Sequence, residues 1–328
     1  MIDAAKIDKL VKKVAEPFER FIYFDDPLFY AFSAIYVLFT YFYDIFDKIP
    51  YLQIYGQKGS GKSFLGSLFN ELCFKPFKTG NISTAAIYRR IGREHNGLTL
   101  IMDEKDDLSH SRNEVLLGIL RSGYEKGGSV TRCLSKGTVE FSTFCPKIII
   151  NEKGIQDSAL ESRTIPIHMT ESPDPIAKFR KLKFEEEAKE IKDLIRSFVK
   201  EHGQLVLTRY HSFKSVGGIK GRDEEVWTPI LVIAGILDTP DAPFSPDDAV
   251  NLAFIRDDMV KLAKKIIKKR EMLEIIGNLD AQILEATWSY IMEADTASGP
   301  NDSYLGDKLL GYIKDCWSIP DLRQPLKI

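Results

Sequence analysis

The sequence predicts an α/β fold in which helices cover a parallel β-sheet, and three observations lead to this prediction. Residues 51–55, 99–102 and 146–151 form short, mostly apolar runs, which are typical of strands buried on both faces. The first run passes through a glycine-rich turn into a segment with apolar residues at helical spacing. The second and third runs end in polar residues, and ligands of open parallel sheets bind at the carboxyl ends of strands.

Composition limits the classes of protein to consider. The chain has 328 residues, of which 44% are hydrophobic and 28% charged, so it can bury a full core and divide into two or three units. The net charge of -2 means that any contact with DNA must come from local basic positions. The four cysteines form no CxxC pair and the five histidines are scattered, which favours neither zinc nor a disulfide framework. We expect a cytoplasmic protein, since the first residues also lack the order of a signal peptide.

Residues 28–46 carry no charge before Asp44 and approach the length of a membrane span. Four tyrosines and acidic flanks, among them Asp25 and Asp47, argue against a span, since lysines and arginines are the usual flanks. The segment is therefore predicted to be a buried helix of a soluble protein, with a membrane span as the alternative.

The turn after residues 51–55 matches G-x-x-x-x-G-K-[ST] through Gly56, Gly61, Lys62 and Ser63. Glycines let successive backbone N–H groups converge on phosphates at a helix N-terminus, where the helix dipole also favours negative charge. We predict that the loop binds ATP, with Lys62 reaching the β- and γ-phosphates and the Ser63 hydroxyl ligating Mg²⁺. The predicted cofactor-binding residues are Gly56, Gln57, Lys58, Gly59, Ser60, Gly61, Lys62 and Ser63.

Three further polar residues at strand ends complete a predicted hydrolytic site. Asp103 and Glu104 follow the run 99–102, so Asp103 is expected to hold Mg²⁺ and Glu104 to orient and polarise the attacking water. Asn151 ends the run 146–151, where its amide can bond the γ-phosphate and that water. A small-molecule kinase does not need a glutamate that activates water, so the adjacent Glu104 favours hydrolysis over phosphorylation of a small molecule.

Arg163 follows a helix-like segment and precedes a fourth predicted strand, residues 164–169. An arginine in this position can leave its own subunit and stabilise transition-state charge in a neighbouring site, which requires a ring or another head-to-tail assembly. The alternatives are a surface ion pair or cap for Arg163, and Arg121 or Arg132 as the residue that acts in trans.

The motifs "GQKGSGKS", "LIMDE", "IIIN" and "ALESR", in this order and spacing, resemble those of AAA+ ATPases. Residues 121–151 and 223–237 more narrowly resemble a family of phage, plasmid and mobile-element ATPases related to superfamily-III and minichromosome-maintenance helicases. The resemblance covers residues 20 to 240 and implies a hexameric ring, a helicase or translocase acting on single- or double-stranded DNA, and a replication partner such as a primase. A nucleotide-dependent switch or protein-remodelling ATPase that does not act on DNA is the alternative function.

The resemblance also implies roles for three basic residues. Residues 129–141 contain two β-rich runs around a glycine-containing turn, which predicts a hairpin. In the helicases that the chain resembles, such a hairpin lines the pore, which implies that Lys136 at the tip and Arg132 near the base contact DNA. An ordinary polar turn is the alternative. Arg222 matches an arginine that senses the γ-phosphate from the start of a helical lid.

The predicted fold is therefore an AAA+-like P-loop NTPase sheet with an inserted β-hairpin, N-terminal helices and an all-α lid and tail. Residues 184–203 are expected to form one helix that stops at Gly203, and Thr228 and Pro229 to begin another. The predicted domain boundaries are 1–50 for an N-terminal helical segment, 51–172 for the ATPase core, 173–278 for a helical lid, and 279–328 for a tail that resembles the start of a winged helix.

Overall fold

The structure is a computed structural model that describes residues 4–80, 82–93, 97–103, 110–134, 137–177, 179–238 and 255–275. The chain separates into two compact units, Met1–Ile267 and Lys268–Ile328, and the fold below is that of the first. Of the second unit, residues 268–275 are described, and they are helical. The predicted division into four parts stays a prediction.

Five parallel strands form the central sheet in the order β2-β3-β6-β1-β7. All residues of β3 and β6, and all but the last residue of β1, are buried, because helices cover both faces of the sheet. The α/β fold with a parallel sheet is therefore confirmed. The strands are β1 (Tyr51–Tyr55), β2 (Pro76–Thr79), β3 (Thr99–Met102), β6 (Lys147–Asn151) and β7 (Thr164–His168).

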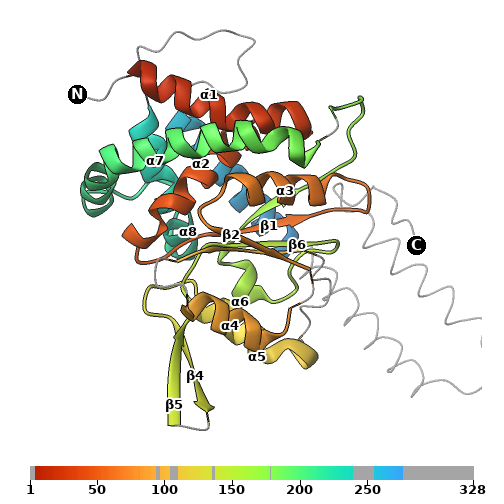
Figure 1. The fold of residues 1–328 in the computed structure, drawn as a ribbon, viewed down its shortest axis with the longest axis vertical. Coiled ribbons are helices and arrows are strands. Elements are labelled where there is room, and N and C mark those ends of the chain that lie inside the picture. Colours follow the sequence, from red (N-terminus) through yellow and green to blue (C-terminus); the bar gives the residue numbers. More distant parts are fainter. Residues whose placement is uncertain are drawn as a thin grey trace, which may run out of the picture. The chain divides into compact units, whose positions relative to one another are not determined.

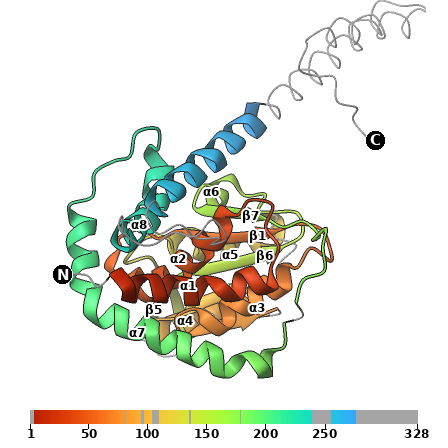
Figure 2. The same cartoon turned by 90° about the horizontal axis from the view of Figure 1, so that it is seen from above.

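The helices form a layer on each side of this sheet (Figure 1). One layer contains α1 (Ala4–Phe21), α2 (Leu28–Phe42), α3 (Lys62–Leu72) and α7 (Lys181–His211), and α1 and α7 lie side by side in both views (Figure 2). The other layer contains α4 (Thr84–Arg93), α5 (His110–Ser122) and the short α6 (Ser158–Glu161). Helix α8 (Gly221–Leu237) packs against α2 and α7, and residues 255–275 form a further helix.

Helix α2 and the 3-10 turn η1 (Tyr43–Ile45) correspond to the apolar segment that approaches the length of a membrane span. The stretch Leu28–Ile45 satisfies a test of length and hydropathy for spans, yet 67% of it is buried inside the protein. Tyr36 is fully buried, and its hydroxyl donates to the carbonyl of Lys147 at the start of β6. The predicted buried helix is confirmed, since α2 lies between the sheet and the other helices.

The predicted hairpin is present as β4 (Ser129–Leu134) and β5 (Gly137–Ser142), which pair antiparallel and project away from the central sheet (Figure 1). Its base packs on α4, where the ring of Phe141 lies 5.1 Å from that of Tyr88. Arg132 stacks over the same Tyr88 ring at 5.2 Å. Lys136, at the predicted tip, lies outside the described residues.

Two predicted helix boundaries are wrong. Helix α7 continues through Gly203, because Val206 extends the buried face formed by Ile195 and Phe198. This packing outweighs the cost of about 1 kcal/mol for a glycine inside a helix. Helix α8 begins at Gly221 rather than at Thr228, whose hydroxyl donates to the Glu224 carbonyl within the helix.

Candidate active site

The loop between β1 and α3 has a backbone that only glycine adopts readily. Gly56, Gly59 and Gly61 have φ angles of 149°, 91° and 87°. A Cβ atom on Gly56 would lie 2.1 Å from the carbonyl oxygen of Met169, the residue after β7. Gly61 caps α3 in the left-handed conformation, so the loop turns directly into a helix whose first N–H groups lack intrahelical acceptors.

Lys62 folds back over this loop. Its Nζ donates to the carbonyls of Gly56 at 2.5 Å and Gln57 at 2.6 Å, so the ammonium lies among the backbone groups of the turn. Lys58 is exposed at the tip of the loop and Ser63 in the first turn of α3. The structure therefore brings together the predicted residues 56–63, and together with the parallel sheet this strand-loop-helix unit is a P-loop NTPase-like fold.

The carboxyl ends of β3 and β6 bring Asp103 and Asn151 to the same edge of the sheet. Asn151 pairs in register with Tyr55, the residue before Gly56, and Asp103 directly follows β3. Neighbouring strands are about 4.8 Å apart, so Asp103 is about two strand spacings from the glycine loop. The amide of Asn151 is held in place, because its Oδ1 accepts a hydrogen bond from the Gly154 N–H at 3.0 Å.

Three buried polar atoms at this edge have no hydrogen-bond partner among the residues that the structure describes: Ser60 Oγ, Asp103 Oδ1 and Asn151 Nδ2. Leaving such a group unpaired costs about 1–3 kcal/mol, so a cluster of them calls for an explanation. A carboxylate and hydroxyl groups are ligands that Mg²⁺ prefers, and an amide N–H₂ donates to phosphate oxygens. The residues at the carboxyl edge therefore fit a magnesium-bound nucleotide.

Lys78 belongs to this edge, although the sequence analysis did not single it out. Its Nζ lies 2.8 Å from Asp103 Oδ2 and 3.3 Å from the Ser67 hydroxyl on α3, so it joins the strand to the helix. Lys78 was missed because β2 has four half-buried residues and no continuous apolar run. Glu104, the predicted base, lies outside the described residues, and its role stays a prediction.

Arg163 lies at the opposite edge of the sheet, where the strands begin. It immediately precedes β7, and its carbonyl accepts a hydrogen bond from the N–H of Tyr51 at the start of β1. Its guanidinium stacks 5.5 Å from the centre of the Tyr124 ring and donates to the Ala159 carbonyl. Burial, and then the charge of Arg222, lower the pKa of Arg163. Its buried Nε has no partner.

Arg222 joins Arg163 rather than the phosphate loop of its own chain. Because α8 begins at Gly221, its first turn places the Arg222 guanidinium 5.3 Å from the centre of the Tyr124 ring. Glu225 accepts hydrogen bonds from Arg222 at 2.6 Å, from the Tyr124 hydroxyl at 3.1 Å and from Lys48 at 2.5 Å. We call this group the amino-edge cluster: Lys48, Tyr124, Arg163, Arg222 and Glu225.

The two alternative arginines are held within their own subunit. Arg121 forms an ion pair with the buried Asp157, whose carboxylate also caps α6 by accepting from the Leu160 N–H at 2.7 Å. Arg132 donates to the Thr131 carbonyl at 2.9 Å beside the Tyr88 ring on the hairpin. Arg163 instead keeps a buried Nε without a hydrogen-bond partner among the described residues, and its role in trans stays a prediction.

Comparisons with known proteins return structures of helicases at low similarity. No protein-family model and no curated protein sequence matches the chain. The helicase described as SCCmec type IV Cch aligns at 16% identity and a TM-score of 0.43, covering 76% of this chain and 51% of that one. JCV helicase aligns at 12% identity, a TM-score of 0.34, and 81% and 60% coverage. The C-terminal region of NrS-1 aligns at 16% identity, a TM-score of 0.35, and 72% and 55% coverage. The chain thus spans little more than half the length of these proteins.

Proposed function

We propose that this protein hydrolyses ATP at the carboxyl edge of its sheet. The observation that supports this most strongly is the set of unpaired buried atoms of Ser60, Asp103 and Asn151 beside a glycine loop. Their unmet hydrogen bonds cost stability in the protein alone and are recovered when a charged, oxygen-rich ligand binds. A nucleoside triphosphate with Mg²⁺ has that chemistry.

The residues of the edge divide the work of hydrolysis. Lys62 and the N–H groups at the start of α3 bind the phosphates, and Ser63 and Asp103 hold Mg²⁺, which neutralises phosphate charge when bound. Glu104 orients the attacking water and accepts its proton. Asn151 donates from Nδ2 to the γ-phosphate, and its fixed Oδ1 keeps the amide in that orientation.

The same proposal requires a head-to-tail ring. Arg163 begins β7 at the amino edge, and the phosphate loop follows β1 at the carboxyl edge, so the strand length separates Arg163 from its own nucleotide. Five strand residues span about 16 Å. The guanidinium of Arg163, stacked on Tyr124 at that edge, serves the nucleotide of a neighbouring subunit, and Arg222 on the same ring accompanies it. We propose a hexamer.

The substrate proposed for this motor is DNA, in a cytoplasmic helicase or translocase that replicates a mobile element, phage or plasmid, with a primase or similar protein as a partner. The projecting hairpin supports this, because Arg132 and Lys136 from each subunit would form a ring of positive charge. The resemblance to mobile-element ATPases in the sequence motifs supports the same substrate.

Steady-state ATP hydrolysis, measured with and without single-stranded DNA, tests this function. We expect DNA to stimulate the wild-type protein, Lys62→Ala to abolish hydrolysis, and Lys136→Ala to remove only the stimulation. Lys189→Ala is the matched control, since this exposed lysine lies on α7 away from the site. Hydrolysis that survives Lys62→Ala would refute the proposed site.

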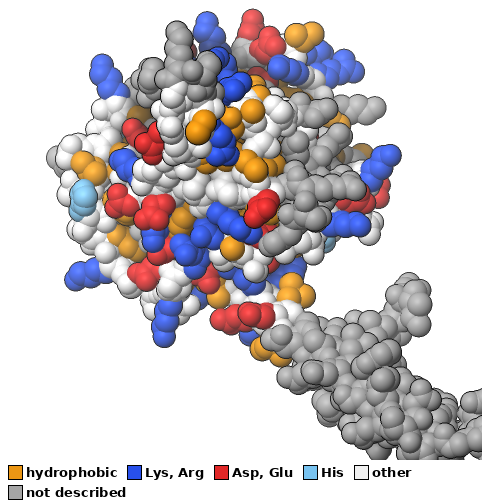
Figure 3. Space-filling model, turned by 90° about the horizontal axis from the view of Figure 1, so that it is seen from below, with side chains coloured by type: hydrophobic (Ala, Val, Ile, Leu, Met, Phe, Trp, Pro, Cys, Tyr) orange, Lys and Arg blue, Asp and Glu red, His pale blue; other side chains and the backbone are white. Residues whose placement is uncertain are grey.

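A protein-remodelling ATPase or nucleotide switch is the second candidate. On the face drawn in Figure 3, Lys and Arg side chains are interspersed with Asp and Glu, in keeping with a net charge of -2. Such a surface lacks the single sign that attracts nucleic acid over long distances. Hydrolysis that requires Lys62 but is unchanged by DNA and by Lys136→Ala would favour this candidate.

A further inference from the structure

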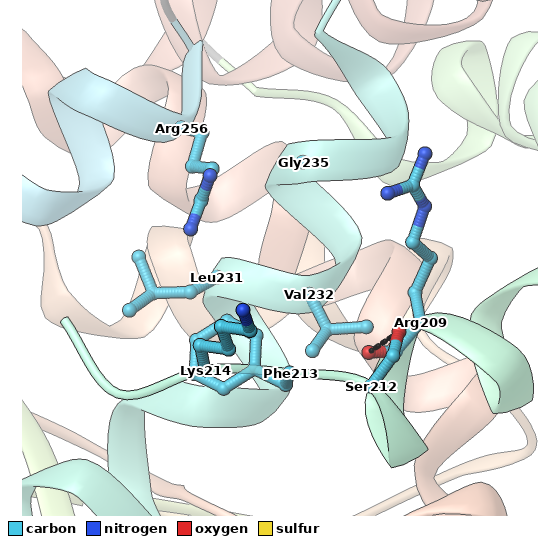
Figure 4. A pocket seen from close by; sticks show the side chains of 8 residues that line it. All are labelled: Arg209, Ser212, Phe213, Lys214, Leu231, Val232, Gly235 and Arg256. Atoms are coloured by element: carbon cyan, nitrogen blue, oxygen red, sulfur yellow. Dashed lines mark hydrogen bonds between the residues drawn. The ribbon is translucent and has the colours of Figure 1, made fainter.

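A cavity of about 240 Å³ lies in the helical part of the first unit and includes no residue of the phosphate loop or of the hairpin. Its walls come from the end of α7, the segment that follows α7, the middle of α8, and the first turn of the helix 255–275 (Figure 4). The lining residues are Arg209, Ser212, Phe213, Lys214, Leu231, Val232, Gly235 and Arg256.

Three of these residues are basic and none is acidic, so the cavity is positively charged. In the described part of the chain, no ion pair involves the side chains of Arg209, Lys214 or Arg256. The nearby Asp238 accepts a hydrogen bond from the backbone N–H of Arg256 rather than from its guanidinium.

Two other basic residues of the helix 255–275 are paired. Lys261 bonds Asp258 at 3.0 Å, and Lys265 bonds Asp26 at 2.7 Å, both from the same helix as Arg256. The three cations line one hollow that has no acidic side chain among its lining residues, and the charge of Arg256 also acts on the Asp238 carboxyl outside that lining, against the burial that raises the pKa of Asp238.

Gly235 makes room for one of these cations. A Cβ atom at this position would lie 3.3 Å from Cδ and 3.8 Å from Nε of Arg256, so the arginine side chain passes directly over the backbone of α8. A glycine inside a helix costs about 1 kcal/mol relative to alanine. The close approach of Arg256 gives this glycine a physical reason.

The floor of the cavity is apolar. Leu231 and Val232 are buried in α8, and the half-buried ring of Phe213 lies beside them (Figure 4). An aromatic face offers a stacking surface for a base. A phosphate flanked by a sugar and a base matches both the cations and the floor.

We infer that this cavity binds the phosphodiester backbone of single-stranded nucleic acid, at a site separate from both the phosphate loop and the hairpin. Arg209, Lys214 and Arg256 contact phosphate oxygens, and Phe213 contacts the adjacent base or sugar. The combination of cations with an aromatic side chain favours nucleic acid over an acidic peptide, for which the aromatic floor has no equivalent role.

The test is binding of a fluorescent oligo-dT to the full chain without nucleotide, measured by anisotropy over a series of salt concentrations. Each contact to a single strand contributes about 0.7 to the slope of log K against log salt. We expect the double variant Arg209→Ala/Arg256→Ala to reduce the magnitude of this slope by about 1.4 and to weaken binding by roughly tenfold or more. Phe213→Leu should weaken binding with an unchanged slope.

Lys261→Ala is the matched control, because it removes a cation of the same helix that is outside the cavity and already paired. Thermal melts of each variant show whether the fold is retained. The binding measurement uses no ATP, so its result does not depend on whether the protein hydrolyses ATP. Absence of oligo-dT binding at the cavity would therefore leave the proposed ATPase activity unaffected.

Two outcomes would overturn the inference. In the first, the double variant of Arg209 and Arg256 keeps the wild-type affinity and salt slope. In the second, inorganic phosphate or a polyglutamate peptide at equal ionic strength displaces oligo-dT from the wild type as well as unlabelled oligo-dT does, which indicates a free-anion or acidic-peptide site. Displacement by oligo-dT alone, lost in the double variant, supports it.

Discussion

The two edges of the central sheet differ in how their polar groups are paired. At the carboxyl edge, Ser60, Asp103 and Asn151 each keep a buried atom without a partner in the described part of the chain, beside a loop whose glycines have positive φ angles. At the amino edge, Glu225 alone accepts from three donors, and Tyr124 lies under two guanidinium groups. Among the described residues, the second edge also keeps two buried atoms without a partner, Thr99 Oγ1 and Arg163 Nε, but they lie beside a network of bonds within the chain rather than beside a glycine loop.

This difference indicates how each edge can contribute to one reaction. Under the proposed function, the unpaired atoms of the carboxyl edge bind the phosphates of the same subunit, since binding recovers the cost of leaving them unpaired. The amino-edge cluster has three cations, Lys48, Arg163 and Arg222, against one carboxylate, so it stays positive after its internal bonds are made. Under the proposed function, this positive edge meets the phosphates of a neighbouring subunit.

The largest expected effect comes from Arg163→Ala. If Arg163 acts in trans, hydrolysis should fall by about 10³-fold, because the transition state loses a preorganised cation. Lys62→Ala and Arg163→Ala subunits should then regain part of the activity when mixed, since the mixed ring contains intact pairs of loop and arginine. A mixture no more active than the mean of its components would assign Arg163 a role within its own chain.

Asn151→Ala tests the carboxyl edge and should lower hydrolysis by about 10²-fold through loss of a donor to the γ-phosphate. The free energy of unfolding should fall by only about 1 kcal/mol, from loss of the bond to Gly154. Ser83→Ala, which removes a comparable bond from a side chain to the Ala86 N–H, is the control for stability alone. Equal losses of activity in both variants would mean that Asn151 is only structural.

Alkaline pH should lower the stability of the protein through three buried tyrosine hydroxyls. Burial raises the pKa of Tyr36, Tyr51 and Tyr124. The unfolded chain therefore releases these protons first, above a pH of about 10, and stability present below that pH is lost as pH rises toward the folded values. The free energy of unfolding should fall by about 1.4 kcal/mol per pH unit for each phenol. Burial lowers the pKa of Lys147, so this lysine contributes in the opposite direction: its contribution to the free energy of unfolding rises with pH up to about pH 10.5.

Urea unfolding at pH 9, 10 and 11, with tyrosinate absorbance as a second signal, measures this dependence. Stability that stays constant from pH 10 to pH 11 would contradict burial of these hydroxyls.

The smallest effect is expected from Tyr124→Phe, which keeps the ring under Arg163 and Arg222 but removes the hydroxyl bond to Glu225. Glu225 keeps Lys48 and Arg222, so the loss in unfolding free energy should be about 1 kcal/mol or less, and hydrolysis should fall only a few-fold. Tyr210→Phe removes a similar bond to Asp47 outside this cluster and should leave hydrolysis unchanged. A loss as large as that of Arg163→Ala would show that the hydroxyl, rather than the ring, positions the arginines.

Local sequence determined the parallel sheet and the glycine loop. Runs such as 51–55 and 99–102 are apolar because they are buried on both faces, and the loop needs glycines at positive φ angles, so both leave direct traces in the residue types. The hairpin 129–141 was equally readable from its β-rich runs and glycine turn. These features depend on neighbours in the chain.

Only the tertiary structure decided which distant residues meet. Lys78 reaches Asp103 from the neighbouring strand β2, whose four half-buried residues form no apolar run. Arg222 stacks on Tyr124 because α8 begins seven residues earlier than Thr228. Helix α7 passes through Gly203 because packing beyond it outweighs a local stop signal. Such contacts depend on burial and on how elements pack, for which residue spacing along a single chain contains no signal.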